Sequence, residues 1–314
     1  MKLSALDVLR CPACRATLEP TVAEKSGDEV ITGSLRCVAC AVSFPVLKGV
    51  PRFVASDSYA DAFSFEWNVH RTTQLDSATG RTDSVDRFAQ SLGSLPELNG
   101  KLVLDIGCGT GRFAEIALDN GATVVGVDLS LAVDAAYKNI GAHPRMHIVQ
   151  ADVFKLPLAL DAFDVIYSLG VLHHTPDCRK AFERLPPHLK PGGRVVITVY
   201  TDRNKYYCMS TNFWRRWTPK LPKGLLYALC HVAIPLYYLY KVPGLRVIGM
   251  GIFPINMDPR ARWRVLDTFD CYSPRYQSYH NFPEVFEWFE TAGLRDLRTI
   301  QPEVTLVGSR PMST

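Results

Sequence analysis

The 314-residue sequence has little net charge and no apolar segment long enough to cross a bilayer comfortably. Its formal charge at pH 7 is only +4, which by itself is too small to indicate a nucleic-acid partner. The segment from Met1 to Asp7 lacks the apolar stretch of a signal peptide, so we expect a cytoplasmic protein. The apolar stretch at residues 225–240 has only sixteen residues and is interrupted by His231 and Pro235. It is therefore too short for a membrane span.

Nine cysteines are present, and in a protein that is not exported they are more often thiols or metal ligands than disulfides. Four of them form two C-x-x-C pairs separated by 22 residues. Two such pairs supply the four sulfurs of a closed tetrahedral zinc site, which leaves no position open for water. A redox-active C-x-x-C would need one pair only, in a thioredoxin-like context that the sequence lacks. We therefore predict a structural Zn²⁺ bound by Cys11, Cys14, Cys37 and Cys40.

Residues 1–55 are predicted to form a zinc-ribbon domain around these cysteines. A segment this short has little hydrophobic core, so metal binding must provide much of its folding free energy. The order of the segments LDVLRCPAC (residues 6–14) and CVACAVSFPVLKGVPRF (residues 37–53) resembles that of the small zinc-ribbon proteins that act as activator subunits of tRNA and protein methyltransferases. The resemblance implies a structural or docking role, with the ribbon here fused to the rest of the chain.

Residues 56–99 are polar and contain one aromatic cluster of Phe63, Phe65 and Trp67. We interpret them as connector helices before a larger domain. From Lys101 onward, short apolar runs alternate with amphipathic stretches, which is the pattern of a parallel β-sheet with crossover helices. The fold class predicted for residues 100–314 is therefore α/β, with helices on both faces of the sheet.

A glycine-rich loop with the sequence GCGTG occupies residues 107–111, directly after a predicted strand at residues 102–105. The dinucleotide-binding fingerprint has two residues between its second and third glycines, whereas this loop has one. Glycines allow the backbone to approach a ligand closely because they carry no side chain. A glycine loop alone is weak evidence for a cofactor site, so further features are needed.

Four further features are spaced along the chain as an adenosine-containing cofactor requires. The second predicted strand ends at Asp128, whose carboxylate can accept both hydroxyls of a ribose. The third ends at Asp152, which can accept a hydrogen bond from an adenine amino group. The fourth, at residues 163–168, runs into the sequence LGVLHH, and a turn at residues 189–193 leads into a fifth strand. Either aspartate can instead cap a helix, because strand ends and helix starts coincide here.

Together these features resemble the class I S-adenosylmethionine (SAM)-dependent methyltransferases, and in particular the type 11 family, over residues 101–200. The resemblance implies a Rossmann-like seven-stranded sheet, completed by antiparallel strands at residues 294–300 and 304–308. SAM has no phosphate, which agrees with the lack of a P-loop lysine. By the same resemblance, the cofactor is expected to contact Asp105, Gly107, Gly109 and Gly111 with its methionine end, Asp128 and Leu129 with its ribose, Asp152 and Val153 with its adenine, and Ser168 and Leu169 near its sulfonium.

Residues 201–280 depart from the minimal domain of this family, so we expect this insertion to determine the methyl acceptor. The apolar stretch at residues 225–240 is flanked by basic residues and lies near Trp214 and Trp217. Three interpretations of it remain open: a hydrophobic lid over an apolar substrate, a peripheral helix at the inner face of the membrane beside a lipid-linked substrate, or plain core or dimer contact. Residues 264–280 are rich in Tyr, Asp and Arg and supply polar groups that can orient a substrate. No sequence feature specifies the oligomeric state.

Methyl transfer from a sulfonium is an in-line displacement, in which an enzyme aligns the reactants and can remove a proton from the nucleophile. His173 and His174 follow the fourth strand, at the sheet edge where substrate and cofactor would meet. Either can act as a base near neutral pH. The alternative is that one of them caps the next helix and the other packs in the core. Rival candidates for the base are Tyr272, Tyr276, Tyr279 and His280.

The leading functional hypothesis is a SAM-dependent methyltransferase that acts on a small-molecule or lipid-linked acceptor, at oxygen. The alternative is a tRNA or rRNA methyltransferase that uses the zinc ribbon to dock its substrate. Against it, the fourth strand reads DVIY at residues 164–167, not the Asn/Asp-Pro-Pro-aromatic motif associated with methylation of exocyclic base amines. A third hypothesis, a degenerate SAM binder without activity, conflicts with the intact glycine loop and with Asp128.

Overall fold

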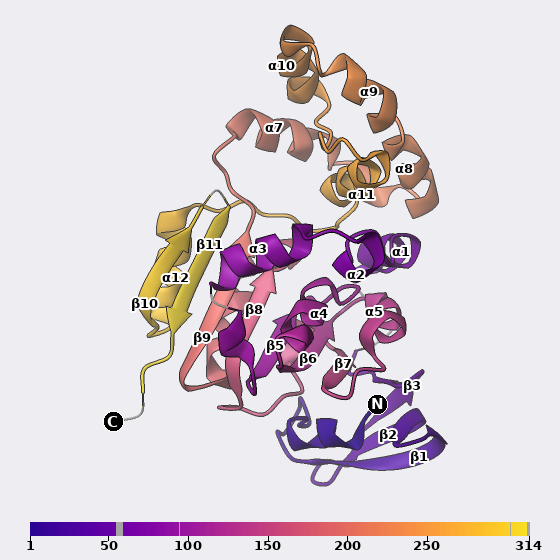
Figure 1. Ribbon diagram of the computed structural model, residues 1–314, viewed down its shortest axis with the longest axis vertical. Coiled ribbons are helices and arrows are strands. Elements are labelled where there is room, and N and C mark those ends of the chain that lie inside the picture. The colour runs from indigo at the N-terminus through magenta and orange to yellow at the C-terminus, as the bar shows by residue number, and fades with distance from the viewer. Residues whose placement is uncertain (55–58, 94, 302, 313–314) are drawn as a thin grey trace.

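The computed structural model describes residues 1–54, 59–93, 95–301 and 303–312. Figure 1 shows three parts along the longest axis: a small β-domain that contains the N-terminus, a central α/β domain, and a group of helices at the opposite end. The predicted boundary between ribbon and connector, at residues 55 and 56, lies outside the described residues.

The amino-terminal domain is a four-stranded antiparallel sheet whose strands follow one another in sequence order. Its strand residues are mostly exposed, and its few buried side chains pack toward the central domain, in one cluster with residues of the large sheet. This agrees with the expectation that the segment has too little core to be stable by itself. Its elements are η1 (Leu3–Asp7), β1 (Leu18–Ser26), β2 (Glu29–Cys37), β3 (Ser43–Leu47) and β4 (Val50–Pro51).

The described part of the connector is helical. Its first helix contacts both α5 (Ala132–Ile140) of the central domain and α11 (Ala261–Tyr272) of the insertion, so the connector lies between these two parts. Its elements are α1 (Asp61–Val69), α2 (Asp76–Thr79), α3 (Asp83–Leu92) and η2 (Pro96–Leu98).

The central sheet has seven strands in the order β10-β11-β9-β8-β5-β6-β7. The strands from β5 to β9 pair in parallel, whereas β11 pairs antiparallel with β9 and β10 with β11. The prediction of a seven-stranded Rossmann-like sheet with an antiparallel last pair is therefore confirmed. The strands are β5 (Leu102–Ile106), β6 (Thr123–Asp128), β7 (Met146–Gln150), β8 (Phe163–Leu169), β9 (Leu189–Val199), β10 (Arg295–Ile300) and β11 (Val304–Ser309).

Helices cover both faces of this sheet, and the middle strands are buried on both sides, as apolar runs in a parallel sheet require. Helix α12 (Phe282–Thr291), which precedes β10, has clear signals at both ends. The Asn281 side chain accepts from the Glu284 backbone N–H at 3.0 Å, and Gly293 follows the helix with a φ of +73°. The elements are α4 (Arg112–Asp119), α5 (Ala132–Ile140), η3 (Val153–Lys155), η4 (Leu172–His174), α6 (Cys178–Glu183), η5 (Pro186–His188) and α12 (Phe282–Thr291).

The insertion at residues 201–280 forms a helical cap beyond the carboxyl ends of the parallel strands (Figure 1). The apolar stretch at residues 225–240 is not one helix but two short ones that break near His231. Among the residues that the structure describes, no helix is both long and apolar enough to cross a membrane. The cap comprises α7 (Lys205–Trp214), η6 (Thr218–Lys220), α8 (Lys223–Cys230), α9 (Ala233–Leu239), α10 (Pro243–Ile252) and α11 (Ala261–Tyr272).

Candidate functional site

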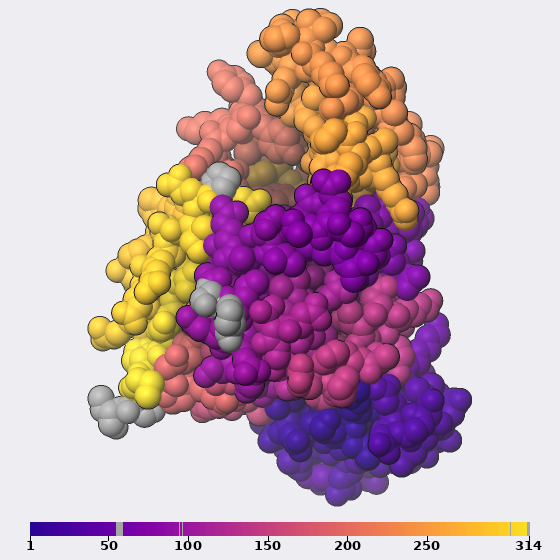
Figure 2. All heavy atoms as spheres, viewed as in Figure 1, coloured from indigo at the N-terminus to yellow at the C-terminus, as the bar shows by residue number. Residues whose placement is uncertain are grey.

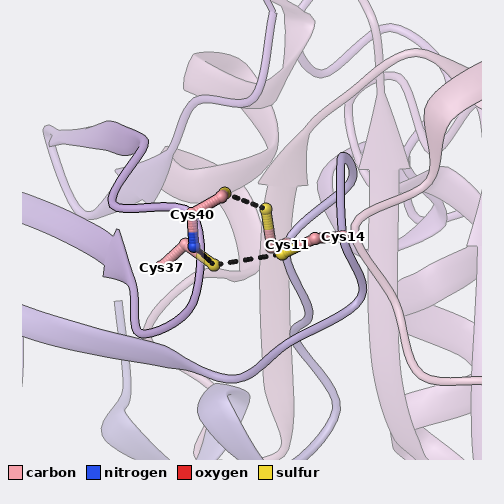
Figure 3. Close-up of side chains that lie close together, drawn as sticks. All are labelled: Cys11, Cys14, Cys37 and Cys40. Atoms are coloured by element: carbon pink, nitrogen blue, oxygen red, sulfur yellow. Dashed lines mark hydrogen bonds between the residues drawn. The ribbon is translucent and has the colours of Figure 1, made fainter.

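The four predicted zinc ligands lie together at the end of the ribbon (Figure 3). All four Sγ atoms lie within 4.8 Å of one another, with Cys11 3.6 Å from Cys40 and Cys14 3.3 Å from Cys37. Four Zn–S bonds of about 2.3 Å in a tetrahedron place sulfurs about 3.8 Å apart, so the observed spacing fits the ion. Within the described ranges, no other group of three or more Cys, His, Asp or Glu side chains is close enough to hold a metal.

Within the cluster the electrostatics favour a thiolate at Cys37, whereas hydrogen bonds with neighbouring thiols raise the pKa of Cys14 and Cys40. The backbone N–H of Cys40 donates to Cys37 Sγ at 3.5 Å and lowers the pKa of that thiol to about 6. Cys11 and Cys37 are buried, and Cys14 and Cys40 are exposed. These residues would hold a four-sulfur Zn²⁺ whose role is structural, because no coordination position is left for a substrate.

The ribbon packs against β7, the edge strand of the large sheet. The backbone N–H of Phe53 donates to the carbonyl of Gln150 at 2.8 Å, and Arg52 pairs with Gln150 in a parallel bridge. The Arg52 guanidinium donates to the Gln150 side chain at 2.9 Å and to Asp134 at 2.6 Å. Gln150 in turn donates to the carbonyl of Leu129 at 2.9 Å. A polar chain thus links the ribbon to a residue that borders the main cavity.

The main cavity has a volume of about 420 Å³ and lies between the carboxyl ends of the strands and the helical cap. This is the position at which open α/β sheets bind their ligands. Of the ten residues predicted to contact the cofactor, Gly107, Gly109, Asp128, Leu129, Val153 and Leu169 border it.

The glycine loop forms one wall of the cavity. Gly107 has a φ of +78°, and a Cβ there would lie 2.4 Å from the Val171 side chain, so only glycine fits. A Cβ on Gly109 would lie 3.6 Å from the Trp67 indole, which places a connector side chain directly over the loop. This cradle fits a cofactor that approaches the backbone closely and carries no phosphate.

Asp128 ends β6 at the cavity wall. Its Oδ1 accepts from the backbone N–H and the hydroxyl of Ser130 at 2.8 and 2.7 Å, and its Oδ2 accepts from the Gly109 N–H at 2.9 Å. Each carboxylate oxygen has two acceptor positions, so one position on Oδ2 remains for a ribose hydroxyl. Burial raises the pKa of Asp128, although these hydrogen bonds oppose the shift.

The other four predicted contacts lie behind the cavity wall. Asp105 is buried beneath the loop, which raises its pKa to about 8, and its Oδ2 has no hydrogen-bond partner among the described residues. Gly111 begins α4 with a φ of +92°. Ser168 donates to the carbonyl of Ile106 at 3.0 Å. Asp152 accepts from the Phe154 N–H at 3.0 Å and caps η3, as the alternative interpretation had it. Contacts of all ten residues with SAM stay a prediction.

The two neighbouring histidines differ in position. His174 borders the cavity, whereas His173 is fully buried, stacks on Tyr200 at 3.7 Å between ring centroids, and does not border it. The Tyr200 N–H lies 3.3 Å from His173 Nδ1, and because an N–H only donates, that nitrogen is the acceptor. His173 therefore packs in the core, and of the two histidines only His174 borders the cavity.

His174 has a defined tautomer. Its Nδ1 lies 3.2 Å from the carbonyl oxygen of Tyr276, which can only accept, so the proton is on Nδ1 and Nε2 has a free lone pair. Nε2 has no hydrogen-bond partner among the described residues and lies 4.0 Å from Asp270 Oδ1. Burial lowers the pKa of His174, although Asp270 opposes the shift, so the ring is neutral near pH 7.

The sequence pattern missed several residues that border the cavity. Tyr59, Phe63 and Glu66 come from the connector, and Asp267 and Asp270 come from α11. The aromatic cluster at residues 63–67 and the polar stretch at residues 264–280 were the only signals for them. The insertion does border the cavity, but through Tyr207, residues 254–256 and α11; no residue of the apolar stretch lines it.

The fold and the glycine-lined cavity define the class: a SAM-dependent methyltransferase domain, joined to a four-cysteine ribbon. Residues 104–197 match the family described as methyltransferase domain, and residues 2–49 match the family described as Trm112p-like protein. The chain therefore carries both domains, and the two resemblances stated from the sequence, for the ribbon and for the methyltransferase domain, are confirmed.

Named relatives differ in what they act on. The chain is 33% identical to 27-O-demethylrifamycin SV methyltransferase of Amycolatopsis mediterranei over 150 residues, which are 45% of this chain and 55% of that protein. It is 33% identical to tRNA U34 carboxymethyltransferase of Proteus mirabilis over 129 residues (39% and 40%), and 32% identical to ubiquinone biosynthesis O-methyltransferase of Coxiella burnetii over 112 residues (35% and 48%). The chain thus spans about half the length of these relatives.

Proposed function

We propose that this protein is a SAM-dependent methyltransferase that methylates an oxygen of a small-molecule or lipid-linked acceptor. The observation that carries the proposal is a single cavity that joins the glycine-lined end at Gly107 and Gly109 to His174. Bound SAM would supply a methyl carbon made electrophilic by its positive sulfur. Residues of this chain would supply alignment, exclusion of water and a proton acceptor.

His174 is the proposed proton acceptor. Its Nε2 lone pair and the Asp270 carboxylate both accept hydrogen bonds and lie 4.0 Å apart, so a hydroxyl group placed beside them could donate its single hydrogen to Nε2. As the acceptor oxygen forms its bond to the methyl carbon, its proton would pass to Nε2, and the electron pair of the broken C–S bond would stay on sulfur. General-base catalysis of this kind contributes about 10²–10⁴-fold.

The direct test supplies labelled SAM and the protein to a cell extract, which is then fractionated into RNA, protein, lipid and small molecules. We expect label in the lipid or small-molecule fraction, and His174→Ala should lower it by about 10²–10⁴-fold with unchanged binding of S-adenosylhomocysteine. His143→Ala, at a partly buried bend outside the cavity, is the matched control. Label in RNA alone would support the alternative of a tRNA or rRNA methyltransferase, which the Trm112p-like domain and the tRNA-modifying relative favour.

The far surface of the cap supports a lipid-linked acceptor. We define the cap tip as residues 238–252, which Figure 2 shows projecting at the end of the molecule opposite to the ribbon. Helix α10 has no buried residue. Val247 is 75% exposed and Ile248 is 62% exposed. Single exposed apolar residues are normal, but several on one segment indicate an interaction surface. The remaining exposed large apolar side chains of the tip are Tyr238, Leu239, Val242, Leu245 and Ile252.

Charge around the tip has one sign. Residues 203–257 contain no Asp or Glu and eight basic residues. An apolar patch with basic surroundings is typical of a surface that lies on an anionic membrane, where each nearby Lys or Arg contributes about 1 kcal/mol. We therefore propose peripheral contact with the inner face of the membrane through α10, beside the apolar stretch that first suggested it. The basic residues are Arg203, Lys205, Arg215, Arg216, Lys220, Lys223, Lys241 and Arg246.

Vesicle flotation tests this contact. The protein should float with vesicles that contain anionic phosphatidylglycerol and much less with pure phosphatidylcholine. The double variant Val247→Asp, Ile248→Asp should stay at the bottom, whereas Leu160→Asp, at an apolar site on the central domain that is 50% exposed, should float like the parent protein. Failure of the parent protein to float would leave a soluble acceptor as the proposal.

A further inference from the structure

Three carboxyl side chains meet at one end of the main cavity. Glu66 comes from α1 in the connector, and Asp267 and Asp270 lie one helical turn apart on α11 in the cap. All three border the cavity. The two helices that carry them are about 200 positions apart in sequence and contact each other, so only the fold brings these acids together.

Glu66 is buried and has no partner. The residue is only 1% exposed, and neither Oε1 nor Oε2 has a hydrogen-bond partner among the residues that the structure describes. Buried polar atoms in folded proteins are nearly always paired, and an exception calls for an explanation. Burial, together with the charges of Asp270 and Asp267, raises the pKa of Glu66 well above its usual value. A hydrogen-bond donor that enters from the cavity would relieve this arrangement.

The groups around Glu66 offer acceptors rather than free donors. Asp267 already accepts from Asn256 at 2.8 Å and from Gln74 at 3.5 Å. Asp270 accepts from the Tyr200 hydroxyl at 3.0 Å, and its other oxygen faces the lone pair of His174 at 4.0 Å. Acceptor thus faces acceptor across this end of the cavity.

Arg112 borders the same cavity, and its charge partly opposes the burial that raises the pKa of Asp267, but it does not pair with the acids directly. Arg112 donates to Ser84 at 2.8 Å and to the Gln74 carbonyl oxygen at 3.1 Å, and its guanidinium lies 4.9 Å from the Phe113 ring centroid. Within the described part of the chain, no ion pair of 4.0 Å or less joins Arg112, or any Lys or Arg, to Glu66, Asp267 or Asp270. The carboxyl groups at this end of the cavity are therefore left without a paired Lys or Arg among the described residues.

We propose that this carboxylate end binds a protonated amine of the methyl acceptor. An ammonium group offers three N–H donors and no acceptor, which matches a set of separated carboxylate oxygens. A metal ion fits less well, since it needs oxygens that converge at about 2.0–2.6 Å and the three acids do not form such a group. Phe63 and Tyr207 border the same cavity and add aromatic side chains, a residue type that attracts cations.

The amine would be a handle and not the methylated atom. A protonated amine has no lone pair, so it cannot attack the methyl carbon, whereas a hydroxyl of the same acceptor can do so beside His174. That the amine belongs to the methyl acceptor rests on the proposed methyl transfer. Binding can nevertheless be measured without turnover, which separates failure of the amine site from failure of the proposed reaction.

The experiment uses the full chain saturated with S-adenosylhomocysteine and titrates it with benzylamine, benzyl alcohol and benzoate as size-matched probes. We expect benzylamine to bind at least about tenfold more tightly than benzyl alcohol, as hydrogen bonds to charged groups imply, and benzoate to bind weakest. Glu66→Gln and Asp270→Asn should each remove most of this preference. Equal binding of the amine and the alcohol by the parent protein would overturn the proposal.

Two controls keep the result interpretable. Glu66→Gln replaces an unpaired buried carboxyl group by an amide of nearly the same volume, so its melting temperature should change little, and loss of binding cannot be ascribed to unfolding. Glu183→Gln, an exposed glutamate on α6, should keep the amine preference. S-adenosylhomocysteine carries an ammonium of its own, so an equal loss of its affinity in Glu66→Gln would assign the carboxylates to the cofactor and overturn the amine site.

Discussion

The ribbon and the cap are additions at opposite ends of the same sheet, and they attach to it in different ways. Buried side chains of the ribbon, such as Leu9 and Val46, belong to the same core cluster as Val149 and Phe163 of the sheet. The cap instead has two small cores of its own, around Phe269 and around Ala233 and Tyr240. The ribbon is thus continuous with the catalytic domain, whereas the cap packs largely on itself.

Their polar contacts differ in the same sense. The ribbon exchanges backbone hydrogen bonds with the central domain, including Arg10 N–H to Pro157 and Ala159 N–H to Val8, both at 2.8 Å. The cap returns to the sheet mainly at its two ends, where Thr201 and His280 form a bridge. The ribbon is thus joined closely to the central sheet, whereas the cap is a largely self-contained helical unit, for which we propose the contacts with the methyl acceptor.

Loss of the metal should have the largest effect. Structural Zn²⁺ in zinc-finger peptides contributes apparent binding free energies of about 10–16 kcal/mol, which is as large as the stability of a typical domain. Chelation, or Cys11→Ser, should therefore unfold the ribbon and expose the β7 edge. Thermal unfolding together with zinc content measures the effect, and Cys208→Ser, outside the cluster, should leave both unchanged. A Cys11→Ser protein with parental stability would show that the ribbon does not depend on a four-sulfur site.

The docking contact comes next in size. Arg52→Ala removes one partner of a mostly buried contact with Asp134 and Gln150, at an expected cost of about 2–4 kcal/mol of unfolding free energy. Because Gln150 holds the Leu129 carbonyl at the cavity, affinity for S-adenosylhomocysteine should also fall by about three- to tenfold, or about 0.6–1.4 kcal/mol. Arg36→Ala, at an exposed position of the ribbon, should change neither quantity. If Arg52→Ala lowered the unfolding free energy but left the affinity unchanged, the ribbon contact would support the fold and not the cofactor site.

Sequence reasoning worked where the relevant contacts are local. The strands of the sheet, the glycine loop and Asp128 are specified by short patterns, since an apolar run, its terminal acid and the following turn are neighbours in the chain. The cysteine spacing likewise identified the ribbon. Asp152 shows the limit of the method: the same position suits an adenine contact and a helix cap, and the structure shows the capping contact.

The acceptor end of the cavity could not be derived in this way. Glu66 looks like an ordinary polar residue on an amphipathic helix, and its burial follows only from the approach of α11, which lies about 200 positions later. The apolar stretch at residues 225–240 was equally ambiguous. Its hydrophobicity is shared between small cores at Leu226 and Cys230 and exposed sites such as Tyr238, and no pattern in the sequence separates the two.

Stability at different pH values should separate the cap from the ribbon more finely. Burial and the charge of Asp270 raise the pKa of Asp267 from 3.8 to about 7. Between these two values the folded state binds more protons than the unfolded state, so the unfolding free energy should fall as pH rises, by up to about 1.4 kcal/mol per unit. Asp267→Asn should remove this part of the slope, measured as the difference from the parent protein so that the buried histidines cancel. Asp119→Asn, at an exposed site, should keep it.

The smallest effect is expected at the cap tip, where a large apolar side chain contributes nothing to the fold. Ile248 is 62% exposed on a helix with no buried residue, so Ile248→Asp should change the unfolding free energy by no more than about 0.5 kcal/mol. Leu226, in α8 of the same cap, is 3% exposed, and Leu226→Asp should cost several-fold more because it places a charge in a small core. Chemical unfolding of the two variants measures the contrast. A large loss of unfolding free energy in Ile248→Asp would mean that α10 is packed against other residues of the protein in solution. The surface proposed to contact the membrane would then be buried.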